Sequence, residues 1–426
     1  MSGSTRPNVV LVTVDSLRAD HCGFHGYEKE TTPTLDSMAD EGLVFENAIA
    51  PGTGTPDSMP AIFTGQFPID GGVRNPDGGP NDNAIAAHMA ARETIPERLS
   101  WLGYRTAAFT PNPWTSRYYG FEAGFDRFVD FFDEDRTKAL FERILDDRAV
   151  PGLSKLRLLM SWFQRENTFR PWESFYDDVV DWIDETDEPY FVWVFLLDVH
   201  FPYLTPPTYR TQSLLSVAHS NIQLYLEDQN TAYDRKTRRR LRRAYDDAVR
   251  YTDDFFDSLL SDIDTDDTTV VVHADHGEGL GEHDSYGHQD VMYEELVHVP
   301  LLVYGNDIEG KYSQPLSLVD LPDALTAIAR GQSPVPDRDA VTVPVSPWQT
   351  RSALRGRRWK YVRDDDANTD HLYDLATDPE ETTTATDQAS PLLDVLSDRL
   401  RSIRRAEDEL RAANRAIDRT TGEREL

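Results

Sequence analysis

Apolar runs that end in acidic or histidine residues constrain the fold of this chain more than any other feature. The clearest run is NVVLVTV at residues 8–14, which is rich in β-branched residues and leads directly into Asp15. A continuous apolar run of this kind is typical of a parallel strand that is buried on both faces. Asp15 then falls at the carboxyl end of the strand, where open α/β sheets form their sites.

Strand and helix patterns alternate along the first three quarters of the chain. We expect further strands at residues 104–110, 190–200, 268–277 and 299–305, and helices at residues 94–103, 173–185 and 238–262. This alternation predicts an α/β protein with a mostly parallel sheet and helices on both faces.

Two long connections and the C-terminal part depart from this alternation. Residues 133–170 and 205–240 lie between strands and are too long for simple loops. We expect them to be helical insertions over the site, acting as a lid or as specificity elements. Residues 1–330 then form the main α/β domain. Residues 331–426 form a small α+β subdomain with antiparallel strands, a helix over 390–415 and a polar tail.

The charge of the chain is strongly acidic, with 75 Asp and Glu against 43 Lys and Arg and a net charge of -32. Such a surface repels nucleic acid and anionic membranes, so we expect neither as a general partner. Only six of the basic residues are lysines. An acidic, lysine-poor surface is typical of salt-in halophiles, because salt screens the repulsion between carboxylates. The composition predicts a halophilic, haloarchaeal source, with an ordinary acidic protein as the alternative.

Cysteine content and hydropathy bear on the cellular location. Cys22 is the only cysteine, which excludes an internal disulfide and a thiolate metal cluster. The first residues lack the charged leader and apolar core of a signal peptide, and no apolar stretch reaches transmembrane length. We therefore expect a cytoplasmic protein without a transmembrane segment, whose oligomeric state the sequence leaves open.

Polar side chains follow three of the expected strands at the point where each strand ends. They are Asp15, His200 and the pair Asp275 and His276. Since the carboxyl ends of parallel strands meet at one edge of a sheet, we expect these side chains to lie close together. Carboxylates with an imidazole suit a divalent cation such as Mn²⁺, Zn²⁺ or Mg²⁺. The alternatives are a turn for Asp15, a helix cap for the Asp-His pair and a packed histidine for His200.

The segment GTGTPDSMPAIFTG at residues 52–65 combines a glycine-rich turn with a helix start. Proline is tolerated in the first helical turn and threonine is a good N-cap, so the pattern predicts Thr55 as the N-cap of a helix. A nearby cation and the positive end of the helix dipole would both lower the pKa of the Thr55 hydroxyl. Thr55 is therefore a candidate nucleophile, with a simple cap as the alternative. Ser58, one helical turn later, is the rival nucleophile.

Nine segments, in order along the chain, resemble the sulfatase family of the alkaline phosphatase superfamily. They are NVVLVTVDSLRADHCGFHGY, TPTLDSMADEGLVFENAIAP, TPDSMPAIFTG, TIPERLSWLGYRTAAF, FVWVFLLDVHFPY, YDDAVRYTDDFFDSLL, VVVHADHGEGLGEHDSYGH, VPLLVYG and RWKYVRDDDANTDHLYDLATDPEET. The resemblance implies an alkaline-phosphatase-like α/β fold and an ester hydrolase activity. It also implies that Asp15, Asp275 and His276 bind one divalent metal ion. Thr55 takes the nucleophile position and completes the ligand set.

The resemblance implies roles for four more side chains. His200 matches the family histidine that contacts the ester or leaving-group oxygen. His288, thirteen residues after Asp275, lies where relatives place a basic residue against the bound anion. Arg18 is expected either to bind substrate beside the metal cluster or to form a structural salt bridge. Asn112 is a candidate for a polar contact with the substrate.

Several departures from the family pattern narrow the chemistry. Formylglycine sulfatases mature a cysteine in a Cys-x-Pro-x-Arg signal, whereas here Thr55 takes the cysteine position and Met59 the arginine position. No formylglycine can form at Thr55, and Cys22 lies outside the motif. Ser16 replaces the second of the paired aspartates that relatives carry, so a calcium site built mainly from aspartates is disfavoured. The identity of the one metal ion stays open among Mn, Zn, Mg and Ca. The ligand set resembles the threonine-nucleophile branch, which includes phosphoethanolamine and phosphoglycerol transferases.

These patterns predict a metal-dependent hydrolase of phosphate or sulfate esters that uses Thr55 as its nucleophile and prefers phosphoesters. The expected substrate is a small-molecule, glycan or lipid ester. Three alternatives remain open: an arylsulfatase-type sulfuric ester hydrolase, a phosphotransferase that moves a phospho-headgroup to an alcohol, and a catalytically silent anion-binding scaffold. Of the other histidines, we expect two in the core or at its rim and leave three undecided: His273 and His298, and His21, His25 and His283.

Overall fold

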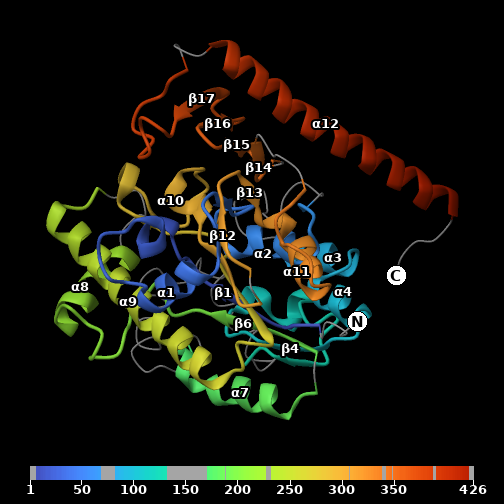
Figure 1. Cartoon of the computed structure of the whole chain (residues 1–426). Coiled ribbons are helices and arrows are strands. Elements are labelled where there is room, and N and C mark those ends of the chain that lie inside the picture. The colour runs from blue at the N-terminus through green and yellow to red at the C-terminus, as the bar shows by residue number, and fades with distance from the viewer. Residues whose placement is uncertain are drawn as a thin grey trace, which may run out of the picture.

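The chain folds around a central sheet that lies between two layers of helices, as a computed structural model shows (Figure 1). The structure describes residues 6–68, 82–131, 170–187, 189–226, 232–306, 308–337, 342–347, 349–386 and 390–421.

Within the described residues, the central sheet has eight strands in the spatial order β12-β2-β11-β7-β1-β6-β4-β5. Their bounds are β12 (Gly310–Tyr312), β2 (Leu43–Phe45), β11 (Leu301–Tyr304), β7 (Thr268–Ala274), β1 (Asn8–Val14), β6 (Tyr190–Leu196), β4 (Arg105–Phe109) and β5 (Arg127–Val129). Neighbouring strands pair in parallel except at β11, which is antiparallel to both β7 and β2. The predicted mostly parallel sheet is therefore confirmed.

The register of the three central strands places their ends level with one another. Val14 at the end of β1 pairs with Leu196 of β6 on one side and with Ala274 of β7 on the other. The residues that follow these three strands therefore leave the sheet at the same edge, as the sequence predicts.

The helices form two groups, one on each face of the sheet (Figure 1). The first group is α1 (Pro33–Glu41), α7 (Tyr176–Glu185), α8 (Leu214–Leu226) and α9 (Arg235–Asp262). The second is α2 (Thr55–Thr64), α3 (Asp82–Ala90), α4 (Ile95–Trp101) and α11 (Leu321–Ala329). α4 begins with a full capping box, in which Thr94 and Glu97 each bind the backbone N–H of the other.

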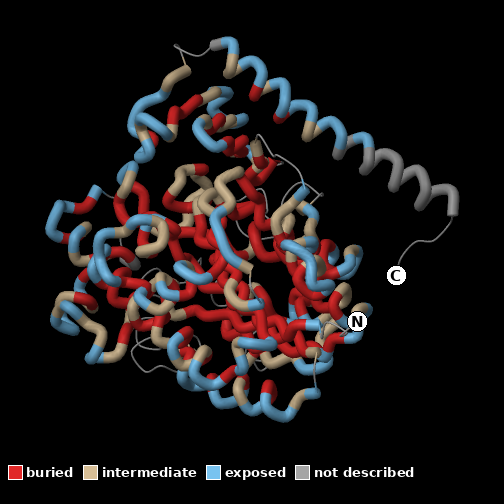
Figure 2. Tube along the Cα trace, viewed as in Figure 1, coloured by how far each residue is buried: buried red, intermediate tan, exposed pale blue. Residues whose placement is uncertain are grey.

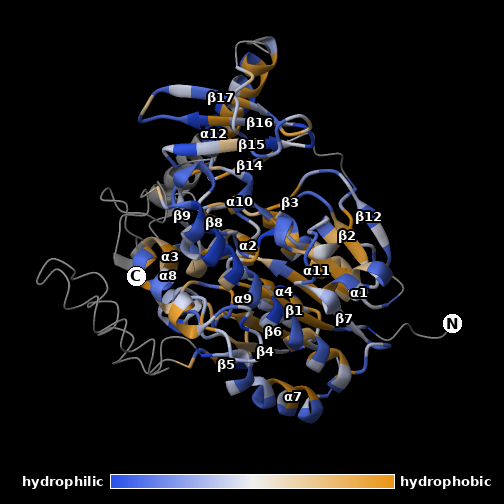
Figure 3. Ribbon diagram, turned by 90° about the vertical axis from the view of Figure 1, so that its left-hand side faces the viewer, coloured by the Kyte–Doolittle hydropathy of each residue, from blue (hydrophilic) through white to orange (hydrophobic). Residues whose placement is uncertain are grey.

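The core lies on both faces of the three central strands. Every residue of β1, β6 and β7 is buried, which explains why these strands are continuous apolar runs. Figure 2 shows the buried residues filling the centre of the molecule, and Figure 3 shows hydrophobic colour on the central strands. On the α2 side, Trp193 of β6 packs edge-on against Phe63 and stacks on Phe121 and Phe125.

The C-terminal part forms a separate antiparallel sheet, as predicted. Its strands follow chain order: β14 (Thr342–Val345), β15 (Arg351–Gly356), β16 (Trp359–Asp364) and β17 (Thr369–Asp374). The helix α12 (Ser390–Thr421) extends past the predicted end and packs Leu396 and Leu400 on this sheet. Lys360 of β16 is fully buried and pairs with Glu294 of α10 (Glu294–Val297) at 3.1 Å, which ties the sheet to the main part.

Only the second of the two expected insertions falls largely within the described residues. The first lies outside the described residues except at its end. The second contains α8 and the start of α9, and its role as an insertion over the site stays a prediction. Among the described helices, none combines the length and the apolar character needed to cross a membrane.

Candidate active site

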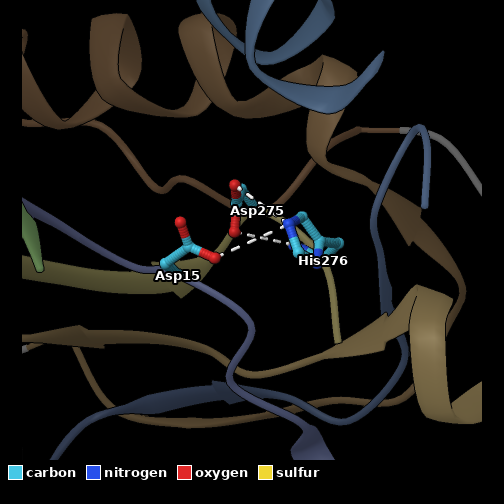
Figure 4. Close-up of side chains that lie close together, drawn as sticks. All are labelled: Asp15, Asp275 and His276. Atoms are coloured by element: carbon cyan, nitrogen blue, oxygen red, sulfur yellow. Dashed lines mark hydrogen bonds and ion pairs between the residues drawn. The ribbon is translucent and has the colours of Figure 1, made fainter. Parts of the chain in front are cut away.

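The candidate site lies where β1 and β7 end. Asp15 follows β1 directly, Asp275 follows β7 directly, and His276 comes next; all three are completely buried. One ligand atom from each lies within 4.8 Å of the others (Figure 4). His276 Nε2 is 3.6 Å from Asp15 Oδ1 and 3.6 Å from Asp275 Oδ2. The structure thus brings together the three side chains that the sequence predicts as metal ligands.

The electrostatics of this cluster fit a bound cation. Burial raises the pKa of Asp15 well above its usual value, and the neighbouring Asp275 carboxylate raises it further, because two buried negative charges repel each other. Asp275 Oδ2 is buried and makes no hydrogen bond to any described residue. Two carboxylates and one imidazole are also the donor set that divalent transition metals accept.

The tautomer of His276 follows from its surroundings. Its Nδ1 lies 2.7 Å from the carbonyl oxygen of Gly277, which can only accept, so Nδ1 carries the proton. In the neutral ring Nε2 then presents its lone pair toward Asp15, Asp275 and the space between them. A histidine held by a carbonyl in this way is the usual arrangement for a metal ligand.

Gly277 holds the turn that positions His276. A side chain there would put its Cβ atom 2.0 Å from the carbonyl oxygen of Glu295, because the two backbones pair closely. The N–H groups of Gly277 and Glu278 donate to the carbonyls of Leu296 and Glu295, each over 2.9 Å. For this steric reason, only glycine fits at the third position of the sequence Asp-His-Gly-Glu.

Thr55 does not cap its helix, so the predicted N-cap role is wrong. Gly54 is the N-cap, with extended backbone (φ -163°, ψ 162°), and its carbonyl accepts from Asp57 and Ser58. Thr55 is the first helical residue, which frees its hydroxyl from capping. Thr55 Oγ1 lies 3.3 Å from His276 Nε2 and 3.4 Å from Asn112 Nδ2. The candidate nucleophile thus contacts the Asp-Asp-His cluster.

The rival nucleophile Ser58 occupies a different position. Its hydroxyl is buried and makes no hydrogen bond to any described residue. It faces Gly52, whose Cβ, if present, would be 3.2 Å from Ser58 Oγ. Thr55, in contrast, contacts both His276 and Asn112. Met59, in the position of the family arginine, is a completely buried core residue.

The two other predicted catalytic histidines lie side by side next to the cluster. His200 Nε2 and His288 Nε2 are 3.3 Å apart, and the rings of His288 and His276 are 4.6 Å apart. His200 Nδ1 donates to the carbonyl of Phe201, so its Nε2 is the acceptor and His288 Nε2 the donor. Burial and the nearby His276 lower the pKa of His200 to about 4.

Glu278 is a site residue that the sequence analysis missed. It is completely buried, and its Oε2 lies 3.6 Å from His288 Nδ1. Burial raises its pKa to about 8, although Arg18 opposes that shift. Its position two residues after His276, inside the family segment VVVHADHGEGLGEHDSYGH, was the signal that could have singled it out.

Arg18 and Asn112 have different surroundings. The buried Arg18 guanidinium pairs with Asp20 at 2.6 Å and Glu282 at 3.0 Å, and it donates to the carbonyl of Glu278. These contacts match the structural salt bridge that the sequence left as the alternative for Arg18. Asn112, in contrast, donates from Nδ2 to Asp15 Oδ2 over 2.8 Å, so it lies inside the site.

The five other histidines named in the sequence analysis contact groups outside this cluster. His273 is completely buried in β7 and bonds Thr13 Oγ1 at 2.8 Å, which confirms its core position. His298 is partly buried and bonds the carbonyl of Glu46 at 3.0 Å. The undecided three lie beside acidic or aromatic neighbours: His21 with Asp246, His283 with Glu295, and His25 against the His298 ring.

Solved structures share this fold. Phosphonate monoester hydrolase of Agrobacterium radiobacter superposes with a TM-score of 0.66 at 16% identity, over 94% of this chain and 96% of that chain. A protein of the alkaline phosphatase superfamily from Vibrio parahaemolyticus gives a TM-score of 0.57 at 18% identity, over 94% and 88% of the two chains. The chain therefore has an alkaline-phosphatase-like α/β fold, with the buried Asp-Asp-His cluster at the ends of its central strands.

The family follows from the sequence match. The model of the sulfatase family matches residues 7–331, and the chain belongs to that family. An ulvan-active sulfatase of Formosa agariphila is 24% identical over 407 residues, which cover 84% of this chain and 73% of that protein.

Proposed function

We propose that this sulfatase-family hydrolase uses Thr55 as a nucleophile on phosphate or sulfate esters and turns over phosphate esters faster. One observation carries the proposal: Thr55 Oγ1 lies 3.3 Å from His276 Nε2, at the edge of a buried Asp-Asp-His cluster. Among the described residues, no other hydroxyl group lies within hydrogen-bonding distance of the His276 ring.

Asp15, Asp275, His276 and the Thr55 hydroxyl would hold one divalent cation, with Mn, Zn, Mg and Ca as candidates. A bound cation would lower the pKa of the Thr55 hydroxyl and offset negative charge on the equatorial oxygens of the transferring group. Thr55 also sits at the N-terminus of α2, where the helix dipole favours negative charge.

The chain's own residues then divide the work of the first step. Asn112 points its Nδ2 toward Asp15 and Thr55, and it would hold the nucleophile in place. Thr55 Oγ loses its proton to solvent and forms a bond to phosphorus or sulfur as the bond to the leaving oxygen breaks. His288, whose Nε2 carries a proton, donates it to that oxygen, which departs as an alcohol. His200, whose Nε2 accepts, would hold His288 in place.

In the second step, water attacks the group held on Thr55. The Thr55 oxygen leaves and takes back a proton, which restores the hydroxyl and releases phosphate or sulfate. Phosphorus accepts such in-line attack readily. A sulfated threonine clears only by attack at sulfur, since it has no second hydroxyl on the same carbon through which sulfate could be expelled. The enzyme would then stall on sulfate esters after one turnover.

Three alternative functions differ in their support. The relatives named as sulfatases favour a sulfuric ester hydrolase, and ulvan-active sulfatase suggests a glycan substrate. An acceptor alcohol in place of water would make the protein a phosphotransferase. A silent anion-binding scaffold needs no bound metal, so the intact ligand cluster speaks against it. The acidic, lysine-poor composition supports a halophilic and cytoplasmic setting.

The test compares kcat/KM for matched aryl phosphate, phosphate diester, phosphonate and sulfate substrates in molar KCl. Mass spectrometry of acid-trapped protein would locate the covalent group. We expect faster multiple turnover of a phosphate-type ester and a phosphorylated Thr55 peptide. Multiple-turnover sulfate cleavage that exceeds phosphate cleavage, or an adduct on Ser58, would contradict the proposal.

A further inference from the structure

The start of α9 is a strongly basic segment in a strongly acidic protein. Residues 235–243 read RKTRRRLRR, with seven basic residues, whereas the whole chain carries a net charge of -32. Five of the seven side chains are exposed: Arg235, Lys236, Arg239, Arg242 and Arg243. Concentrated positive charge of this kind attracts an anionic partner.

Little of this charge is neutralised within the described residues. Arg242 pairs with Glu282 at 3.0 Å, and the partly buried Arg238 pairs with Asp284. For Arg235, Lys236, Arg239 and Arg243, the structure shows no ion pair with any described residue. These four charges lie on the outer side of the helix and remain available to a partner.

Two exposed leucines lie beside this basic segment. Leu214 and Leu215, at the start of α8, are 50% and 83% exposed. The chain that leads to them runs along α9, because Thr211 N donates to Asp247 Oδ2 over 2.9 Å and Gln212 Nε2 donates to the carbonyl of Arg240 over 2.8 Å. The two helices pack side by side in Figure 1.

We propose that the first turn of α8 and the basic start of α9 form a docking surface for an anionic lipid bilayer. Exposed leucines insert into the apolar boundary of a bilayer, while neighbouring arginines stay at the headgroups. A nucleic acid or a sulfated polysaccharide would satisfy the arginines but leave both leucines in water. The acidic remainder of the protein is repelled by such a bilayer, which would restrict contact to this surface.

The surface is connected to the candidate site through one short hairpin. Arg238 donates to the carbonyl of Gly281, at the tip between β8 (Gly279–Leu280) and β9 (Tyr286–Gly287). His288 follows β9 directly. Docking would therefore bring headgroups close to His288, and this consequence rests on the proposed hydrolase function, whereas docking itself does not.

Co-sedimentation of the full-length protein with vesicles tests the proposal. Vesicles of phosphatidylcholine alone are compared with vesicles that contain phosphatidylglycerol, in a KCl series over which circular dichroism shows folded protein. We expect binding to the anionic vesicles only. Each basic residue at a bilayer is worth roughly a factor of five at physiological ionic strength, so Arg239→Gln with Arg243→Gln should weaken binding by at most about 25-fold, and by less as KCl screens the charges.

The apolar part has its own variant and controls. Leu214→Ser with Leu215→Ser should weaken binding at all KCl concentrations, because insertion is not screened by salt. Trp101→Ser and Arg330→Gln, at exposed positions on α4 and after α11, should bind as the unchanged protein does. Turnover of a soluble aryl ester should be the same in both double variants, which separates this test from that of the proposed function.

Three results would overturn the proposal. The first is equal binding to neutral and anionic vesicles, and the second is binding that neither double variant weakens. The third is tight binding to dextran sulfate that the arginine variant loses and the leucine variant keeps, without binding to vesicles. That third result would assign the basic segment to a soluble polyanion.

Discussion

The side-chain amide of Asn112 donates to Asp15 Oδ2 over 2.8 Å. Its other end is fixed as well, because Asn112 Oδ1 accepts from the backbone N–H of Trp114 at 2.9 Å. These two contacts assign the oxygen and the nitrogen of the amide without ambiguity. Nδ2 also lies 3.4 Å from Thr55 Oγ1, so one rigid donor joins a proposed metal ligand to the proposed nucleophile.

Removing this donor should impair both the metal site and the reaction. We expect Asn112→Ala to lower metal affinity and kcat/KM by roughly 10- to 100-fold, the usual effect of losing a partner that orients a metal ligand. Asn112→Asp should be worse, because it adds a third buried carboxylate beside Asp15. Metal titration followed by kinetics at saturating metal separates the two effects. Wild-type kinetics in Asn112→Ala would show that the contact has no role.

Asp275→Asn should lose the metal while the fold persists. The amide keeps the shape of the carboxylate but removes one of the two buried negative charges, so affinity for a divalent cation falls. We expect activity to drop by more than about 100-fold, with unchanged circular dichroism and less than stoichiometric metal by elemental analysis. Full activity of this variant after exhaustive chelation would exclude a metal held by Asp15, Asp275 and His276.

Thr55 should be replaceable by serine but not by alanine. Thr55→Ala removes the nucleophile, and we expect no covalent adduct and no turnover above the level of the metal site alone. Thr55→Ser keeps a hydroxyl at the N-terminus of α2 and should retain measurable turnover. Ser58→Ala is the matched control, since it deletes a buried hydroxyl one turn away. An adduct that persists in Thr55→Ala and disappears in Ser58→Ala would identify Ser58 as the nucleophile.

The ends of these strands could be predicted because each end is determined by the residues immediately around it in the sequence. A buried parallel strand needs a continuous apolar run, and Asp15 and Asp275 stand where such runs stop. Parallel pairing then brings them to one edge. The antiparallel direction of β11 could not be predicted, because the sequence of a short apolar strand does not indicate whether it pairs in parallel or antiparallel.

The finer features of the site depend on contacts between distant segments. Thr55 was assigned as a cap because its sequence context fits one, and only the extended backbone of Gly54 shows that the helix starts one residue earlier. Glu278 escaped notice because its role depends on burial and on His288, ten residues away in sequence. Arg18 remained undecided because only one of its two ion-pair partners, Asp20, is close in sequence, whereas Glu282 is distant.

The buried His88 should make stability depend on pH. His88 on α3 bonds Thr64 Oγ1 of α2 at 2.8 Å, while its buried Nδ1 has no partner among the described residues. Burial, together with Arg92, lowers the pKa of His88 to about 3. The unfolded chain therefore takes up a proton near pH 6.5, and the folded protein does not until about pH 3.

This difference stabilises the fold above pH 6.5, and the contribution is lost as the pH falls. The loss is about 1.4 kcal/mol for each pH unit below 6.5. His88→Gln removes the titration, so the difference in unfolding free energy between the two proteins should shrink by that slope. Urea unfolding at pH 7.5, 6 and 5 measures it. A difference that stays constant over this range would show that His88 titrates alike in both states.

Folding should require high salt. The net charge of -32 makes the compact state repel itself, and the Debye length falls from about 10 Å at 0.1 M to about 3 Å at 1 M salt. Screening therefore stabilises the folded protein more than the expanded unfolded chain. We expect the Tm to rise continuously with KCl up to molar concentrations, whereas sucrose, which is excluded from the surface but carries no charge, should raise it much less. A Tm that is independent of KCl, or equal increases with sucrose of the same osmolality, would exclude relief of charge repulsion as the cause.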